Sequence, residues 1–89
     1  MNFDPAKNAA NIANHGLDLS FGDRVMADGQ ALHALDDSMN YDEERWNVLG
    51  MVAGVVYHLT YTDRVEGFRY ISLRCATRRE TDHYFRQAR

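Results

Sequence analysis

The arginines of the last third of the chain are the residues most able to do chemistry. Arg69 and Arg74 lie in a run of alternating apolar and polar residues, 68–74, and Arg78 and Arg79 follow directly. A guanidinium group presents a planar fork of N–H donors that fits the oxygens of a phosphate. We therefore predict a phosphate-handling site here. The plainer alternative is that these arginines are solvated or paired with acids.

The same stretch predicts a strand that runs into a capped helix. Alternation over residues 68–74 is typical of a strand with two differently used faces. Thr77 and Glu80 have the spacing of a capping box, in which each side chain accepts a hydrogen bond from the other residue's backbone N–H. We expect a helix over residues 78–87, which would place the four arginines near one end of a sheet. This helix is expected to turn Tyr84, Phe85 and Ala88 toward the core and Arg79, His83 and Arg86 toward solvent.

A first helix is predicted between Asp4 and Gly16. Aspartate before Pro5 is a strong start, because its carboxylate caps free N–H groups, and glycine is a common stop. Small residues are expected to form the face that packs against the sheet: Ala6, Ala9, Ala10, Ile12 and Ala13. Lys7, Asn11 and His15 recur at every fourth position and form a polar ridge, for which a solvated face and a functional role both stay open.

The middle of the chain predicts a second short helix and then the strands of a meander. Ser20 and Asp23 form a weaker capping box, and Gly29 is the expected end of this helix. Residues 31–35 are a short strand candidate. Residues 36–44 form an acidic loop that should be exposed and mobile.

Two apolar strands at residues 45–51 and 55–61 are joined at Ala53-Gly54, the pattern of a β-hairpin. Residues 63–67 form the turn into the strand that carries Arg69 and Arg74. We therefore predict an α+β fold with two N-terminal helices, an antiparallel sheet of about four strands and a C-terminal helix, with the helices covering one sheet face.

Composition indicates one soluble domain spanning residues 1–89. No apolar run approaches the roughly 20 residues that cross a bilayer, and no signal peptide is apparent, so we expect a cytoplasmic protein without a membrane contact. The net charge is −3, but residues 64–89 hold seven bases and three acids, whereas residues 1–63 are strongly acidic. This asymmetry permits contact with a polyanion.

Other catalytic patterns are absent from the sequence. The four histidines, His15, His33, His58 and His83, have no partner at the spacing of a zinc site, so we expect no metal and no cofactor. There is no glycine-rich phosphate loop and no serine or cysteine nucleophile motif. Cys75 is the only cysteine and is interpreted as a small packing residue.

Several separated motifs carry a resemblance that covers nearly the whole chain. They are Phe3-Asp4-Pro5-Ala6-Lys7 with Asn11 and His15-Gly16; Glu43-Glu44-Arg45-Trp46 with Leu49-Gly50; Tyr61-Thr62; and Arg69-Tyr70-Ile71-Ser72-Leu73-Arg74 with Ala76-Thr77-Arg78-Arg79-Glu80 and Tyr84. In this order and at these separations, the chain resembles the BrnT family of bacterial toxins, relatives in fold of the RelE-type ribonucleases.

The resemblance implies a type II toxin-antitoxin system and a RelE-like fold. The toxin would be a ribosome-independent endoribonuclease that arrests translation and is neutralised by a BrnA-like antitoxin with a ribbon-helix-helix DNA-binding part. It also implies a toxin dimer bridged by antitoxins in a heterotetramer, which contacts operator DNA only through the antitoxin.

Metal-free RNA cleavage assigns roles to particular residues. The RNA supplies its own 2′-hydroxyl nucleophile, so the protein must help deprotonate it, stabilise the phosphorane and protonate the leaving oxygen. Arg69 and Arg74 are predicted to hold the phosphate, with Arg78 or Arg79 assisting. The remaining roles are assigned as alternatives or as supporting contacts: His15 or Glu44 as base, Tyr84 or His83 as acid, and Arg45 and Lys7 as further RNA contacts.

Two rival functions come from other classes. A non-catalytic module would bind nucleic acid or a partner through the basic end of the chain, without cleavage or toxicity. A regulatory domain would bind a small anion in the arginine cluster and would be stabilised by that ligand.

Overall fold

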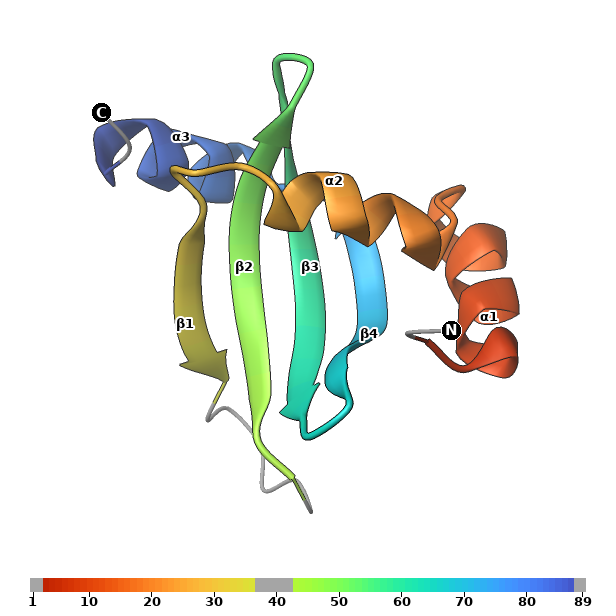
Figure 1. Cartoon of the computed structure of the whole chain (residues 1–89). Coiled ribbons are helices and arrows are strands. Elements are labelled where there is room, and N and C mark those ends of the chain that lie inside the picture. The colour runs from red at the N-terminus through yellow and green to blue at the C-terminus, as the bar shows by residue number, and fades with distance from the viewer. Residues whose placement is uncertain (1–2, 37–42, 88–89) are drawn as a thin grey trace.

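The computed structural model describes residues 3–36 and 43–87, which form three α-helices, a short 3-10 helix and four strands. In chain order they are α1 (Pro5–His15), η1 (Leu19–Phe21), α2 (Gly22–Met26), β1 (Leu32–Asp36), β2 (Arg45–Val52), β3 (Val55–Arg64), β4 (Gly67–Cys75) and α3 (Arg78–Gln87). The strands form one antiparallel sheet in the order β1-β2-β3-β4, which confirms the predicted α+β class. Figure 1 shows α2 crossing in front of β2 and β3, and α1 beside β4.

Helix α1 has the predicted ends but not the predicted orientation. The Asp4 carboxylate accepts a hydrogen bond from the Ala6 N–H at 2.9 Å, and Gly16 ends the helix at φ 70°. The expected packing face was wrong, because Ala6, Ala9, Ala10, Ile12 and Ala13 are all exposed. Asn11, from the polar ridge, is the buried residue of α1. The helix lies along the edge of β4, where backbone polar groups need partners that alanine cannot supply.

The second helical segment differs from its predicted cap. Asp18, rather than Ser20, caps the 3-10 helix, and its carboxylate accepts from the Ser20 N–H at 2.9 Å. Helix α2 has no side-chain cap, because its N-cap residue is Phe21, and Asp23 accepts a hydrogen bond from the Tyr70 hydroxyl at 2.5 Å. The helix ends at Met26, earlier than the Gly29 that the sequence indicated.

The hairpins follow the local turn chemistry. Ala53 and Gly54 have φ of 50° and 84°, the left-handed pair that a tight two-residue hairpin turn requires. The next turn is tighter than the predicted 63–67, because β3 continues through Arg64, which pairs with Gly67. Strand β1 occupies residues 32–36, one residue later than predicted. Most of the acidic loop, residues 37–42, lies outside the described residues.

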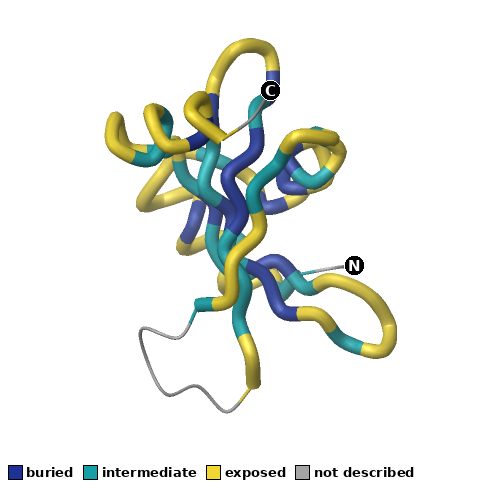
Figure 2. The backbone as a smooth tube through the Cα atoms, turned by 90° about the vertical axis from the view of Figure 1, so that its left-hand side faces the viewer, coloured by how far each residue is buried: buried dark blue, intermediate teal, exposed yellow. Residues whose placement is uncertain are grey.

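Two clusters of buried side chains lie on opposite faces of the sheet. The larger cluster joins the sheet to η1 and α2, with Leu19 and Val25 against Val48, Leu59 and Leu73. The smaller cluster joins Leu49 and Val56 to Tyr84 of α3. Successive side chains along a strand point to opposite faces, and the two clusters contain the successive residues Val48 and Leu49. Helices α2 and α3 therefore cover different faces of the sheet, which corrects the expectation of one covered face. Figure 2 shows burial concentrated along the strands between these layers.

Helix α3 begins with the predicted capping box. The Thr77 N–H donates to Glu80 Oε1 at 2.8 Å, and the Glu80 N–H donates to Thr77 Oγ1 at 3.1 Å. Tyr84 is buried as expected, but Phe85 is 53% exposed, because α3 crosses only one end of the sheet and buries a narrow face. Ala88 lies outside the described residues.

Two further observations concern the exposure of Cys75 and the length of the helices. Cys75 is exposed, so its interpretation as a packing residue was wrong. None of the helices described here has the length and apolar character to cross a membrane.

Candidate functional site

The sheet face on the α3 side is only partly covered, and we call its uncovered part the open face. Because residues opposite each other in an antiparallel pair share a face, the register places its side chains in rows across the strands. From the α3 end, these rows are Leu32, Leu49, His58 and Arg74; then Ala34, Asn47, Thr60 and Ser72; then Asp36, Arg45, Thr62 and Arg69. Most of these side chains are polar and half-buried, as a ligand-facing surface would be.

One end of the open face holds an arginine cluster, which we define as Arg45, Arg64 and Arg69. Arg64 donates two hydrogen bonds to the Glu43 carboxylate, at 2.6 and 3.2 Å. The hydrogen bond from Arg64 is the main cause that lowers the pKa of Glu43, and the charges of Arg45 and Arg69 lower it further. All three guanidinium groups therefore lie around the Glu43 carboxylate, and Asp36, opposite Arg45, adds a second carboxylate to the same row.

Arg69 is the member of this cluster best placed to bind a ligand. Among residues 3–36 and 43–87 it forms no hydrogen bond and no ion pair, although the Glu43 charge is nearby. It pairs across β4 and β3 with Thr62, which is buried and whose Oγ1 has no hydrogen-bond partner in the described part of the chain.

Arg74 lies at the other end of the open face and is held in an ion pair. Its Nη1 and Nη2 donate to the two Glu80 carboxylate oxygens at 2.8 and 3.0 Å. This hydrogen bonding is the main cause that lowers the pKa of Glu80 to about 2. Glu80 therefore both caps α3 and fixes the Arg74 side chain.

The expectation that the four arginines lie near one end of the sheet was wrong. Arg69 and Arg74 are opposite Thr62 and His58 of β3, which are roughly 13 Å apart at the rise of an extended strand. Arg78 and Arg79 are exposed in the first turn of α3, beyond the open face. The strand and the helix were predicted correctly. However, β4 is long enough to place Arg69 and Arg74 at opposite ends of the open face.

The other predicted site residues are dispersed. Lys7 and His15 line a shallow polar groove between α1 and β4, together with Asn11, Asn14 and Ser72. Glu44 is exposed directly before β2.

Tyr84, proposed from sequence as an acid, is buried away from solvent. Its hydroxyl donates to Asp28 Oδ2 at 2.5 Å. Burial first, and this hydrogen bond second, raise the pKa of Tyr84 to about 12. Its contacts give it a structural role in joining α3 to the segment before β1.

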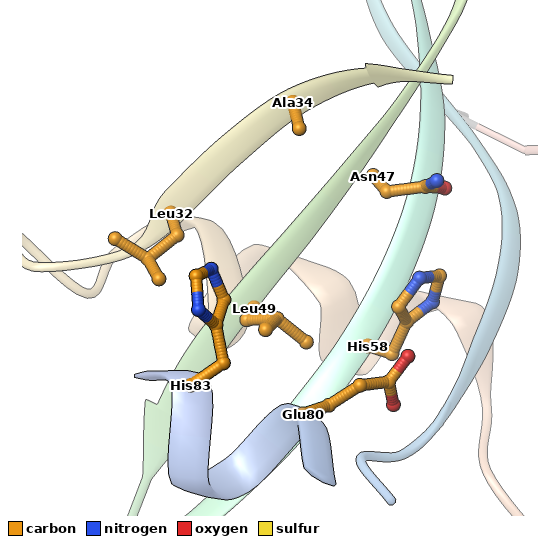
Figure 3. Close-up of a pocket in the computed structure, with 7 residues that line it drawn as sticks. All are labelled: Leu32, Ala34, Asn47, Leu49, His58, Glu80 and His83. Carbon is orange, nitrogen blue, oxygen red and sulfur yellow. The ribbon is translucent and has the colours of Figure 1, made fainter. Parts of the chain in front are cut away.

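A cavity of about 170 Å³ opens where α3 meets the open face. Its lining combines apolar and polar side chains: Leu32, Ala34, Asn47, Leu49, His58, Glu80 and His83. Figure 3 shows the His58 and His83 rings on either side of Leu49. Burial, and then the charge of Arg74, lower the pKa of His58, which favours the neutral ring at pH 7.

Sequence reasoning assigned no role to His58 or Asn47. The alternation of β3 puts His58 on one of two faces, but only strand register and the position of α3 bring it to the same cavity as His83. No group of three or more His, Cys, Asp or Glu side chains that could hold a metal occurs in the described ranges.

The fold and the open face define the class of this molecule as a small α+β protein that presents a cation-lined antiparallel sheet. Comparison with protein families gives the particular group. Residues 3–80 match the model described as ribonuclease toxin, BrnT, of type II toxin-antitoxin system. The chain belongs to this family, which confirms the resemblance read from the sequence, and it is a toxin of a type II toxin-antitoxin system with ribonuclease function. A search of curated proteins gave no match.

Proposed function

We propose that this toxin is an endoribonuclease that cleaves RNA without a metal ion and without the ribosome. The observation that carries the proposal is the arginine cluster, where the Arg69 guanidinium has no hydrogen-bond or ion-pair partner in the described ranges. Arginine fits a phosphate with two parallel N–H donors, and its charge is permanent at neutral pH. This cluster supplies the positive charge that a metal ion supplies in other nucleases.

The cluster would act on the charge that develops during cleavage. RNA attacks its own phosphate through the 2′-hydroxyl, so the largest demand is stabilisation of the anionic pentavalent intermediate. Arg69 and Arg45, on either side of Thr62, are proposed to hold that phosphate. Arg74 already donates to both oxygens of Glu80, so its proposed role is to position Glu80 and α3, and not to bind the phosphate.

Acid-base roles are proposed for groups that solvent and substrate can reach. Glu44 is exposed and adjacent in the chain to the cluster, so it is our first choice as base, with His15 as the alternative. Lys7 and His15 lie on the far side of β4 and would extend the contact with the RNA backbone, as would Arg78 and Arg79 on α3. Tyr84 is left out of the mechanism, because its hydroxyl is buried and donated to Asp28. His83 lies at the cavity rather than in the arginine cluster, so the leaving 5′-oxygen is proposed to take its proton from solvent water.

Membership of this family also supports a proposal about the partners of this toxin. A type II system pairs the toxin with a protein antitoxin. We propose a BrnA-like ribbon-helix-helix antitoxin that neutralises the toxin in the cytoplasm. We further propose a toxin dimer within a heterotetramer that reaches operator DNA through the antitoxin.

A second candidate function is a non-catalytic toxin homologue that only binds its partner. The bidentate pair of Arg74 with Glu80 favours it, because one of the two arginines expected to bind phosphate is neutralised. This candidate predicts no growth arrest on induction and no cleavage by the purified protein.

Induction in cells and cleavage in solution separate the two candidates. The toxin should arrest growth when it is induced alone, and co-expression of the neighbouring antitoxin should restore growth. Purified toxin should cut RNA in EDTA with no ribosomes present, leaving new ends that can be mapped. Cleavage only with ribosomes, or only with added metal, would contradict the proposed mechanism. Absence of cleavage under all conditions would favour the non-catalytic homologue.

A further inference from the structure

We propose that the cavity between α3 and the open face binds one nucleobase of the RNA and so sets the nucleotide preference near the cut. This inference rests on the proposed ribonuclease function. It concerns the seven lining residues defined above and adds a binding site to the phosphate contacts of the arginine cluster.

The floor of the cavity selects against a phosphate. Leu32, Ala34 and Leu49 form an apolar surface, and the Glu80 carboxylate faces the same space. An anion placed there would lose its water, gain neither a hydrogen bond nor a positive charge from the apolar floor, and be repelled by Glu80. A planar, uncharged and partly apolar ring is the group that such a cavity accommodates, and a nucleobase has these properties.

Asn47 is oriented to recognise the edge of such a ring. Its Oδ1 accepts a hydrogen bond from Thr60 Oγ1 at 2.9 Å, which fixes the orientation of the amide. The Asn47 amide nitrogen then presents N–H donors at the cavity wall, where the hydrogen-bond acceptors of a base could receive them.

Glu80 supplies the complementary acceptor. Its Oε1 already accepts from Arg74 and from the Thr77 N–H, whereas its Oε2 accepts only from Arg74 among the described contacts. Oε2 therefore keeps a lone pair for an amino or ring N–H group of a base. Arg74 holds this carboxylate in one position, so the ion pair would orient Glu80 toward the bound base.

The two imidazole rings can stack on the bound base. Both line the cavity, from β3 and α3 respectively, on either side of Leu49. Aromatic side chains, including histidine, bind unpaired RNA bases by stacking, and this contact suits a single-stranded substrate. His58 faces the charges of Arg74, Glu80 and Asp36, and His83 is exposed at the rim.

The cavity and the arginine cluster are close enough to share one RNA strand. Two rows of the sheet separate His58 from Thr62, which corresponds to roughly 13 Å along β3. A base in the cavity and a phosphate at Arg69 would belong to neighbouring parts of the same short segment. The base seated in the cavity would then fix which phosphate reaches the cluster.

A cavity-filling variant tests the proposal through the pattern of cleavage. Ala34→Phe places a ring in the cavity, and Leu35→Phe places the same ring on the opposite face of β1, where Leu35 is 45% exposed. The wild type and Leu35→Phe should share one nucleotide preference in mapped RNA ends. Ala34→Phe should lose that preference and cut about tenfold more slowly or worse, because one stacked base contact is lost. An unchanged preference in Ala34→Phe would overturn the proposal and leave the ribonuclease function standing.

A second variant reverses the hydrogen bonding without filling the cavity. Asn47→Asp keeps the shape of the side chain and the oxygen that accepts from Thr60, but it replaces N–H donors with an acceptor. The preferred nucleotide should change, while the total number of cuts in a mixed RNA falls less than it does for Ala34→Phe. The same preference in Asn47→Asp and wild type would contradict a recognition role for this amide.

Nucleoside binding tests the cavity independently of cleavage. Adenosine, guanosine, cytidine and uridine carry no phosphate, so they probe the cavity rather than the arginine cluster. At least one should shift the ring proton resonances of His58 and His83 in NMR spectra of the wild type and of Leu35→Phe, but not of Ala34→Phe. Failure of all four, or equal shifts in Ala34→Phe, would overturn the inference, whether or not the protein cleaves RNA.

Discussion

The side-chain amide of Asn11 replaces a neighbouring strand for Leu73 at the edge of the sheet. It accepts a hydrogen bond from the Leu73 N–H at 2.9 Å and donates to the Leu73 carbonyl at 2.8 Å. The same amide nitrogen donates to the Leu17 carbonyl at 2.9 Å. One side chain therefore satisfies the edge of β4 at Leu73 and holds α1 against the strand that carries Arg69 and Arg74, while Phe3 bridges the same edge at Tyr70.

Removal of this amide should destabilise the fold. Asn11→Ala should lower the free energy of unfolding by about 3 kcal/mol, because it leaves buried backbone groups of Leu73 without partners. Asn11→Asp should also be destabilising, since a carboxylate can accept from the N–H but cannot donate to the carbonyl. Urea denaturation measures both, and Asn14→Ala, at an exposed position of the same helix, is the control. Equal stability of Asn11→Ala and Asn14→Ala would contradict the role of Asn11.

A methyl group at Gly50 should disturb the contact between α2 and the sheet. A Cβ there would lie 2.6 Å from the Val25 carbonyl oxygen and 2.8 Å from its Cγ1. Gly50→Ala should therefore cost about 3 kcal/mol of stability through overpacking against a backbone atom. Gly29→Ala is the matched control, because nothing lies within 4 Å of its Cβ. Thermal melting measures both variants. Equal melting midpoints for Gly50→Ala and Gly29→Ala would contradict the close packing at Gly50.

Tyr84 should matter for stability and not for cleavage. Tyr84→Phe removes the hydroxyl that donates to Asp28, and we expect a loss of about 2 kcal/mol for a buried hydrogen bond to a charged acceptor. Asp28 keeps its hydrogen bond from the Met51 N–H. The rate of RNA cleavage by folded Tyr84→Phe, measured well below its melting temperature, should match the wild type. A folded variant with no activity would restore Tyr84 as a catalytic acid.

The Arg74–Glu80 pair should give the fold a distinct acid sensitivity. The pKa of Glu80 is lowered from 4.5 to about 2 in the folded state, mainly by its hydrogen bonding to Arg74. The unfolded chain therefore takes up the proton first, so the stability from this pair is full above pH 4.5 and falls as the pH drops toward 2.

Glu80→Gln isolates this effect, because glutamine keeps the capping hydrogen bonds but not the charge. The wild type should be more stable than Glu80→Gln at pH 6, and the difference should shrink between pH 4.5 and pH 2. Urea unfolding at pH 6 and pH 3 measures it. A difference that stays constant with pH would mean that the ion pair adds nothing in the folded state.

Local chemistry explains what the sequence could predict. Asp4 and the pair of Thr77 and Glu80 form their caps because the partners are at most three residues apart. The Ala53-Gly54 turn follows from its own backbone preferences. These features need no knowledge of the rest of the chain.

The remaining features depend on distant contacts. Helical periodicity assigned Asn11 to a polar ridge, and only the open edge of β4 explains its burial. The sequence indicated a cap at Glu80 but not that the same carboxylate engages Arg74. His58 enters the candidate site because the register of β3 and the crossing of α3 bring it to the cavity that His83 also lines.

Cleavage of RNA by Arg69→Ala tests the central claim most directly. Purified wild type, Arg69→Ala and Arg86→Ala would be compared on one RNA in EDTA, after circular dichroism has shown that all three are folded; Arg86 is an exposed arginine of α3 outside the open face. Arg69→Ala should cut at least about 10²-fold more slowly, because a preorganised cation at the phosphate is lost, while Arg86→Ala should match the wild type. Equal rates for all three proteins would contradict a phosphate site at the arginine cluster.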